Sequence, residues 1–393
     1  PHFPGTEDHN RVRDYLVNEL ETLGLEVEIQ EQVAINKKWR AATNTKNILT
    51  KIDGSGQGNA LMLLSHYDSN PHSAIGASDA GSGVVVILEA VRAFIETGKT
   101  PANDIIICFS DAEELGLLGA NAFVNKHPWA KDVGLVLNLE ARGSGGPSYM
   151  LMETNGGNKK LVDAFDKANM EYPLGNSLMY SVYKMLPNDT DLTVVREDGN
   201  INGFNFAFIG DHFDYHTEQD SFDRMDMSSF LHQASYLLSG LSYFSEADLS
   251  DLDSDIDYVY FNFPVLGMVF YPFSWVQPWV LLCTLVFVVL LFLGFSRRKL
   301  SVTGVLVGLL FFSLALVVTA LMAFLGWKLL LLIHPQYNDI LHGFTYNGYY
   351  YIGFFVSLTL TLCFLIYRKI FSKRNLEDLM TAPLLIWLLI NIG

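Results

Sequence analysis

The stretch ALMLLSHYDS, residues 60–69, joins an apolar run to a histidine and an aspartate. Its first part, residues 60–65, is an uncharged apolar run of the length and composition of a strand in a sheet core. His66 and Asp68 follow directly. In an open α/β sheet, ligands bind in the crevice outside the carboxyl ends of the strands. The stretch therefore predicts an α/β fold with a functional site at one edge of its sheet.

Acidic and histidine side chains recur in short motifs, several of them directly after an apolar run. The candidates are His66 and Asp68 in SHYDS, Asp79 in SDAGSG, Glu113 and Glu114 in SDAEELG, Glu140 in LNLEARG, and His216 in DYHTEQD. Strands predicted at residues 104–110 and 133–139 precede the Glu pair and Glu140, so the side chains should converge. So many carboxylates share one place only if a cation neutralises them. The mixture of His and Asp or Glu without Cys suits zinc or a similar divalent ion, so the sequence predicts a hydrolytic metal site.

The remaining pattern predicts helices between the strands. Thr6 is the expected N-cap of a helix that runs to about Leu23, with Gly24 as its stop. Further helices are expected at residues 83–95, 117–125, 158–169 and 228–243, and further strands at residues 149–153 and 204–209. Helices that alternate with apolar strands indicate a largely parallel sheet covered by helices.

The ordered set of motifs resembles the co-catalytic zinc peptidases of the aminopeptidase type over roughly residues 6–244. This resemblance implies a three-layer α/β fold with a mostly parallel central sheet, and two Zn²⁺ ions per chain. The ligand sets that it implies are His66, Asp79 and Glu114 for one zinc, and Asp79, Glu140 and His216 for the other. Asp79 would then bridge the pair.

The resemblance also implies roles for the two remaining candidates. Asp68 would be the carboxylate that orients His66, since metal-bound imidazoles generally have such a partner. Glu113 would be the general base. Many soluble members have Asp where this chain has Glu140, and Glu at that position is similar to the membrane-bound branch of endoplasmic reticulum metallopeptidases and vacuolar membrane proteases. The stretches LPNDTDLTV (residues 186–194) and YHTEQDSFD (residues 215–223) resemble the same branch.

Some nearby residues have two interpretations. His212 is an alternative ligand to His216, although the Tyr-His-Thr context favours His216. Asp189 and Asp191 either shape the substrate pocket or cap a helix. The triplet Asn188-Asp189-Thr190 matches a glycosylation sequon, which applies only in a eukaryotic source. No residue is assigned to substrate binding.

Charge and apolar residues divide the chain into two parts. Residues 1–258 carry 18 Lys and Arg against 39 Asp and Glu, whereas residues 259–393 carry 8 against 3. The acidic first part argues against nucleic acid or an anionic membrane surface as a partner. We expect a metallopeptidase domain at residues 1–245, an acidic linker at residues 246–258 and a membrane domain at residues 259–393. Because no apolar segment precedes the first domain, we expect a fragment trimmed at both ends.

The membrane domain is expected to contain about four transmembrane helices. They are predicted at residues 275–295, 303–327, 349–367 and 380–393, the last one truncated. Basic residues cluster at 297–299 and 368–374, and the loop at residues 334–347 has no Lys or Arg. By the positive-inside rule, the peptidase domain faces the non-cytoplasmic side, in the periplasm or an organelle lumen.

These features predict a multi-pass membrane protein that carries a dinuclear zinc exopeptidase. Aminopeptidase action on peptides is the favoured activity. Glutaminyl cyclase-like chemistry with a single zinc, carboxypeptidase activity on the same fold, and a catalytically inactive receptor-like module are the alternatives. The expected partners are a peptide substrate and the lipid bilayer, with no nucleic acid, and the oligomeric state is left open.

Overall fold

The computed structural model describes residues 1–393 except 57, 73, 187, 188, 372, 373 and 393. It consists of two compact units, Pro1–Phe273 and Ser274–Gly393. Residues 187 and 188 of the LPNDTDLTV motif, and with them the sequon Asn, lie outside the described residues, as does Lys373 of the last basic cluster.

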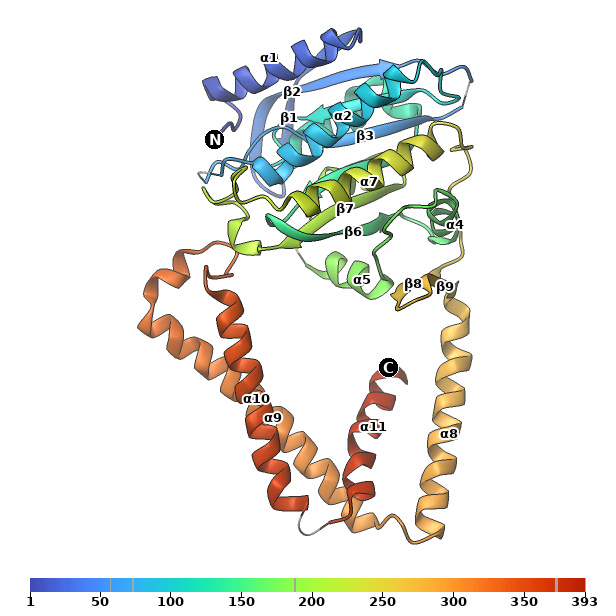
Figure 1. Cartoon of the computed structure of the whole chain (residues 1–393), viewed down its shortest axis with the longest axis vertical. Coiled ribbons are helices and arrows are strands. Elements are labelled where there is room, and N and C mark those ends of the chain that lie inside the picture. The colour runs from blue at the N-terminus through green and yellow to red at the C-terminus, as the bar shows by residue number, and fades with distance from the viewer. Residues whose placement is uncertain (57, 73, 187–188, 372–373, 393) are drawn as a thin grey trace. The chain divides into compact units, whose positions relative to one another are not determined.

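The first unit alternates strands and helices along the chain (Figure 1). Its helices are α1 (Glu7–Thr22), α2 (Gly83–Glu96), α3 (Leu118–Lys126), α4 (Lys159–Lys167), α5 (Ser177–Met185), α6 (Asp191–Gly199) and α7 (Met227–Phe244). Its strands are β1 (Val27–Asn36), β2 (Ala41–Ile52), β3 (Ala60–His66), β4 (Ile105–Ser110), β5 (Val133–Ala141), β6 (Gly145–Glu153), β7 (Gly203–Gly210), β8 (Tyr258–Phe263) and β9 (Gly267–Pro272).

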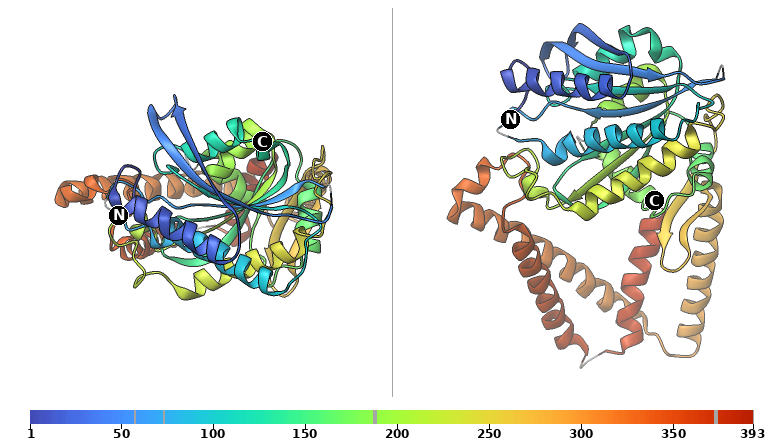
Figure 2. Two further views of the ribbon diagram at one scale, coloured as in Figure 1. Left: turned by 90° about the horizontal axis from the view of Figure 1, so that it is seen from above. Right: turned by 45° about the horizontal axis from the view of Figure 1, so that its top comes forward.

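Among the described residues, seven strands form one twisted sheet in the order β1-β2-β4-β3-β5-β7-β6 (Figure 2). The central pairs β4–β3, β3–β5 and β5–β7 are parallel. The pairs towards the two edges, β1–β2, β2–β4 and β6–β7, are antiparallel. The predicted α/β fold with a mostly parallel central sheet is therefore confirmed.

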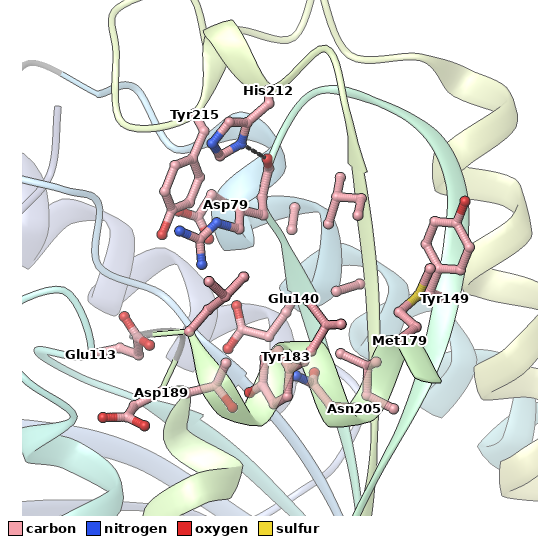
Figure 3. A pocket seen from close by; sticks show the side chains of 18 residues that line it. Asp79, Glu113, Glu140, Tyr149, Met179, Tyr183, Asp189, Asn205, His212 and Tyr215 are labelled. Atoms are coloured by element: carbon pink, nitrogen blue, oxygen red, sulfur yellow. Dashed lines mark hydrogen bonds between the residues drawn. The ribbon is translucent and has the colours of Figure 1, made fainter. Parts of the chain in front are cut away.

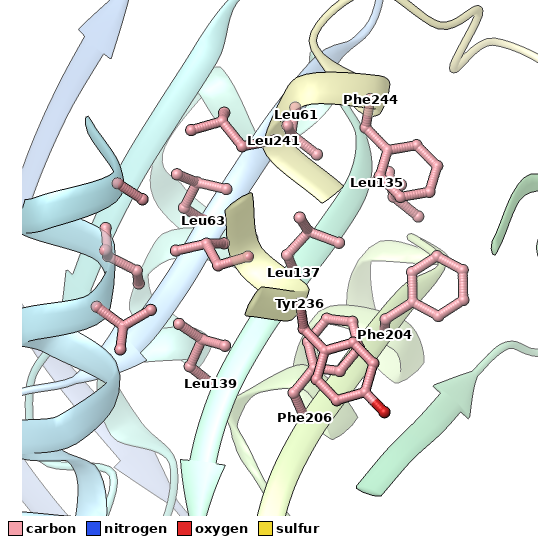
Figure 4. Close-up of a cluster of buried hydrophobic side chains, with 14 of the residues drawn as sticks. Leu61, Leu63, Leu135, Leu137, Leu139, Phe204, Phe206, Tyr236, Leu241 and Phe244 are labelled. Atoms are coloured by element: carbon pink, nitrogen blue, oxygen red, sulfur yellow. The ribbon is translucent and has the colours of Figure 1, made fainter. Parts of the chain in front are cut away.

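Side chains of the central strands alternate between two apolar cores, one on each face of the sheet. On β3, Leu61 and Leu63 face a core shared with α1, α2, α4 and α7, whereas Met62 and Leu64 face a core shared with α3 and α6. Figure 4 shows the first core, where Tyr236 of α7 stacks on Phe206 of β7 at a centroid distance of 4.5 Å. Burial on both faces explains why these strands read as continuous apolar runs in the sequence.

The acidic segment at residues 246–258, predicted as a linker, lies within the first compact unit. Leu249 and Leu252 are buried in the main core, while the Asp residues next to them are exposed. Gly157 N donates a hydrogen bond to the Ser254 carbonyl. The hairpin of β8 and β9 then follows, with Tyr260 buried, so the unit ends at residue 273 rather than at 245.

The second unit contains α8 (Val276–Ser296), α9 (Val302–Ile333), α10 (Gly348–Phe371) and α11 (Leu376–Ile392). Among the described residues, three helices are long and apolar enough to cross a membrane, at Phe273–Ser296, Val302–Ile333 and Gly348–Phe371. The predicted fourth span corresponds to α11, which is shorter at 17 residues and has Pro383 in its interior. Asp378 of α11 accepts hydrogen bonds from Ser301 N and Oγ at the start of α9.

Candidate metal centre

The sheet topology brings all seven candidate side chains to the carboxyl ends of its parallel strands. His66 ends β3, Glu140 lies near the end of β5, and the remaining candidates lie in loops or turns that follow strands. Asp79 lies in the turn Ala77–Ser82 before α2, and its peptide bond to Ala80 is cis. This convergence is the one expected for an open α/β sheet.

Asp79 lies between the two histidines. Its Oδ1 is 3.3 Å from Nε2 of His66, and its Oδ2 is 3.2 Å from Nε2 of His216. Each oxygen of this one carboxylate therefore faces a different imidazole. A carboxylate in this position has the geometry of a bridge between two cation sites.

A glutamate completes each half of the site. Oε2 of Glu140 is 3.6 Å from Nε2 of His66, and Oε2 of Glu114 is 3.0 Å from Nε2 of His216. The ligand atoms of His66, Asp79 and Glu140 lie within 4.8 Å of one another, and so do those of Asp79, Glu114 and His216. His66, Glu113 and Glu114 form a third such group. The resemblance implied Glu114 with His66 and Glu140 with His216. In the structure Glu140 lies beside His66 because β3 and β5 are neighbours and both residues lie at their ends.

The protonation behaviour of the cluster reflects buried, crowded carboxyls. Burial, together with the neighbouring charge of Asp79, raises the pKa of Glu114 to about 7. Burial also raises the pKa of Glu113 and of Glu140. For His216, burial lowers the pKa, but the nearby carboxylates of Asp79 and Glu114 more than offset this and raise it to about 9. Burial and crowding thus disfavour the charged forms of these glutamates, and a bound cation would stabilise them.

Two atoms of the cluster that could bind a metal ion lack hydrogen-bond partners in the described part of the chain. They are Oε1 of Glu114 and Nε2 of His216, both buried. Nε2 of His216 lies close to two carboxylate oxygens, yet neither contact has hydrogen-bond geometry. A buried carboxylate oxygen and a buried imidazole nitrogen without hydrogen-bond partners are atoms that a divalent metal ion can bind. The residues present thus fit zinc by their chemistry and their orientation.

Asp68 supports the cluster in a different way from the one expected. Nδ1 of His66 is bonded to the backbone carbonyl of Asp68 at 2.9 Å, whereas the nearest Asp68 carboxylate oxygen is 3.6 Å away. That carboxylate accepts the backbone N–H groups of Glu113, at 3.0 Å, and Glu114, at 3.3 Å. The main chain of Asp68 therefore orients the imidazole, and its side chain fixes the loop that carries both glutamates.

The structure adds two residues that the sequence did not single out. Nδ2 of Asn70 donates to Oε2 of Glu114 at 2.8 Å and lies 3.1 Å from Nδ1 of His216. Asp220 accepts the backbone N–H groups of Ser78 and Asp79 at 2.7 and 3.1 Å. Asp220 is the last residue of the quoted motif DYHTEQD, and Asn70 directly follows SHYDS; this closeness to the motifs was the available signal.

The residues with two interpretations are now placed. His212 lies outside the metal-ligand groups, and its Nδ1 is bonded to the Arg142 carbonyl at 2.6 Å. Asp189 lies in the wall of a cavity and forms an ion pair with Lys38 at 2.7 Å. Asp191 is buried in the first turn of α6 and accepts a hydrogen bond from Ser110 at the end of β4. Burial raises the pKa of Asp191 to about 7.

A cavity of about 380 Å³ opens beside the cluster. Figure 3 shows the carboxylates of Asp79, Glu113 and Glu140 on one side of it, and Tyr149 and Met179 on the opposite side. The apolar wall comes from β6, β7 and α5 and the residue after it; it includes Leu151, Met179, Val182, Leu186, Ala207 and Ile209. The cavity can hold a group of amino-acid size against the metal-binding residues.

Comparison with known proteins agrees with this geometry. Residues 47–240, which contain every member of the cluster, match Peptidase family M28. This part of the chain belongs to peptidase family M28. The matched residues run from β2 into α7, so the M28 match covers the whole parallel part of the sheet.

The first compact unit, Pro1–Phe273, contains this match and is called the M28 unit below. The chain has relatives in the membrane-bound branch, as the motifs predicted. The chain is 32% identical over 274 residues to the vacuolar membrane protease of Candida dubliniensis, which covers 67% of this chain and 28% of the relative. It is 28% identical over 336 residues to endoplasmic reticulum metallopeptidase 1 of Rattus norvegicus, which covers 84% of this chain and 33% of the relative. The chain thus spans about a third or less of the length of these relatives.

Among solved structures, the chain is similar to Porphyromonas gingivalis glutaminyl cyclase, with a TM-score of 0.50 and 22% sequence identity. The similarity covers 62% of this chain and 92% of that one. It supports the fold, and the fold alone.

Proposed function

We propose that this chain carries a membrane-anchored zinc exopeptidase that acts as an aminopeptidase on peptides. The position of Asp79 carries the proposal, because its two oxygens face two separate His and Glu pairs. Six ligand positions exceed what one tetrahedral zinc uses. We therefore propose two Zn²⁺ ions, one held by His66, Asp79 and Glu140, and the other by Asp79, Glu114 and His216.

In such a site, paired zinc ions lower the pKa of water and polarise the scissile carbonyl. Glu113 lines the cavity beside the proposed ligands, and burial raises the pKa of its carboxyl. A carboxylate in this place can exchange a proton with a water held at the ligands. Glu113 accepts the proton of the attacking water and returns it to the leaving amine. The Asp68 carboxylate accepts the backbone N–H groups of Glu113 and Glu114, which fixes the loop that carries the proposed base and the proposed ligand.

The acidic wall supports a substrate with a free amino group. Asp79, Glu113, Glu140 and Asp189 line the cavity together with a single Lys or Arg, Arg142, among the described residues. Asp79 and Glu140 are proposed zinc ligands, so Glu113 and Asp189 are the carboxylates of the wall that remain to attract a positively charged α-amine, which an N-acylated peptide lacks. The apolar wall opposite would take the side chain of the first residue.

Hydrolysis of a peptide panel by the detergent-purified chain, loaded with zinc, tests this function. We expect cleavage of leucine p-nitroanilide and of free Leu-peptides, little cleavage of N-acetylated forms, and two zinc ions per chain by elemental analysis. Release of carboxyl-terminal residues from N-blocked peptides would instead establish a carboxypeptidase. Conversion of N-terminal Gln to pyroglutamate with one zinc per chain would establish a cyclase.

A further inference from the structure

We propose that Arg142 is a specificity-determining residue that binds a carboxylate of the substrate. This deepens the proposed peptidase function of the same cavity. The substrates would be zwitterionic peptides, in which an anionic group lies within reach of the reacting bond. The carboxylate belongs either to the side chain of the first residue or to the free carboxyl terminus of a dipeptide.

The backbone of Arg142 is fixed on both sides. Its N–H donates to the Phe208 carbonyl at 2.8 Å, and its carbonyl is bonded to Nδ1 of His212 at 2.6 Å. The residue follows directly on β5, two positions after Glu140. Successive side chains of a strand alternate in direction, so residues 140 and 142 leave the chain on the same side. A side chain that starts from such a rigid backbone is positioned precisely enough for recognition.

The guanidinium group lies close to the metal centre. Its Cζ is 5.2 Å from the centroid of the Tyr215 ring, and that ring stacks on His216 at a centroid distance of 3.6 Å. One aromatic ring therefore separates the Arg142 charge from a metal-ligand imidazole. Arginine on an aromatic face keeps its donor fork in a fixed plane, which suits two-point binding of a carboxylate.

The charges of the cavity wall explain why this cation matters. Four acidic residues line the cavity, and in the described part of the chain Arg142 is the one Lys or Arg among the lining residues. Two of these residues, Asp79 and Glu140, are proposed zinc ligands, and Asp189 is paired with Lys38. None of the four carboxylates can donate a hydrogen bond to an anionic substrate group while ionised. Arg142 is therefore the lining Lys or Arg that can bind such a group by charge and by its donor fork.

Substrate pairs that differ by one charge test the proposal in the zinc-loaded full chain. Leu-Ala and its amide differ in the terminal carboxylate, and the p-nitroanilides of Glu and Gln differ in the side-chain carboxylate. We expect Arg142→Met to lower kcat/KM about 10–100-fold for the charged member of one pair, the range of a charge-assisted hydrogen bond, and to change its neutral partner less than about twofold. Arg142→Lys should recover part of the loss, because it keeps the charge without the fork. Arg11→Met, on the exposed face of α1, is the matched control.

The results distinguish the two possible sources of the carboxylate, and they distinguish failure of the Arg142 proposal from failure of the peptidase function. A loss confined to Leu-Ala assigns the terminal carboxylate, and a loss confined to the Glu substrate assigns the side chain. Equal losses on charged and neutral substrates, or no loss on either charged one, would overturn the proposal. Calorimetric binding of Leu-Ala and its amide to Glu113→Gln, with and without Arg142→Met, is independent of turnover. If the wild-type chain cleaves no peptide but Arg142 still governs this binding difference, the peptidase function fails and the carboxylate site stands.

Discussion

Glu113 and Glu114 are neighbours in the chain but face different surroundings. Glu114 lies against His216 and Asn70, whereas Glu113 lines the cavity. We expect Glu113→Gln to lower kcat by about 10²–10⁴-fold, the usual contribution of a general acid–base group, with metal content nearly unchanged. Turnover of leucine p-nitroanilide and elemental analysis of the same sample measure both effects. Glu21→Gln, on the exposed surface of α1, is the control. Loss of metal from the Glu113 variant would show that the two glutamates have exchanged roles.

Asn70 is a residue of the site that the sequence analysis did not identify. Its amide contacts both Glu114 and His216, so it fixes the direction of two ligands in one half of the site. Removing a residue that orients metal ligands typically lowers metal affinity by about 10–100-fold. We expect Asn70→Ala to weaken zinc binding by that amount in a competition titration with a fluorescent chelator. Asn44→Ala, at an exposed position of β2, should leave the affinity unchanged. An unchanged affinity for Asn70→Ala would remove Asn70 from the site.

At the scale of elements, the start of α2 is packed against the strands that carry the ligands. A Cβ at Gly83 would lie 2.5 Å from Oγ of Ser65 and 2.9 Å from the Leu139 carbonyl. Gly to Ala within a helix ordinarily stabilises by up to about 1 kcal/mol. At Gly83 the close approach to β3 and β5 should reverse the sign of this effect. We expect Gly83→Ala to lower the free energy of unfolding by about 1–3 kcal/mol. A thermal unfolding midpoint at or above that of the wild type would contradict this packing. Val85→Ala, on the exposed side of α2, is the control.

The strands that precede the site residues could be predicted from the sequence because their apolar runs end directly before polar or charged residues. Helices α5 and α6 were not predicted. In α5 no side chain is fully buried, so it lacks a clear apolar stripe. Leu249 and Leu252 were not predicted as core residues because they lie among Asp residues. Their spacing, with exposed residues between and after them, is the pattern of a segment that packs on a core with one side. The pairing of His66 with Glu140 depends on strand order, which no local pattern encodes.

At the scale of the whole molecule, the basic clusters predict the orientation in the membrane. Arg297, Arg298 and Lys299 follow α8, and further basic residues lie at and after the end of α10. The loop at residues 334–347 between them has no Lys or Arg. Short loops of this kind orient membrane proteins with their basic residues in the cytoplasm. We expect the M28 unit on the opposite side, in the periplasm or an organelle lumen.

Protease added to spheroplasts, or to sealed vesicles of known orientation, measures this topology. The M28 unit should be digested only from the non-cytoplasmic side, and an antibody against residues 297–299 should bind only after permeabilisation. Digestion from the cytoplasmic side, with protection from the other, would reverse the assignment.

The two halves of the metal centre become available at different times during synthesis. His66, Asp79 and Glu140 have all been made once residue 140 is added, but the second half requires His216, which follows β7. At roughly 5–20 residues per second, the ribosome needs on the order of ten seconds to reach it. We expect a nascent chain arrested near residue 190, with Glu140 outside the ribosome and His216 not yet made, to hold zinc far more weakly than one arrested beyond residue 260. Zinc retained on purified ribosome complexes measures this difference. Equal retention would mean that the first three proposed ligands suffice. For the proposed two-zinc site, the order of the ligands along the chain makes zinc capture a late event, so activity would begin only after the whole sheet has been translated.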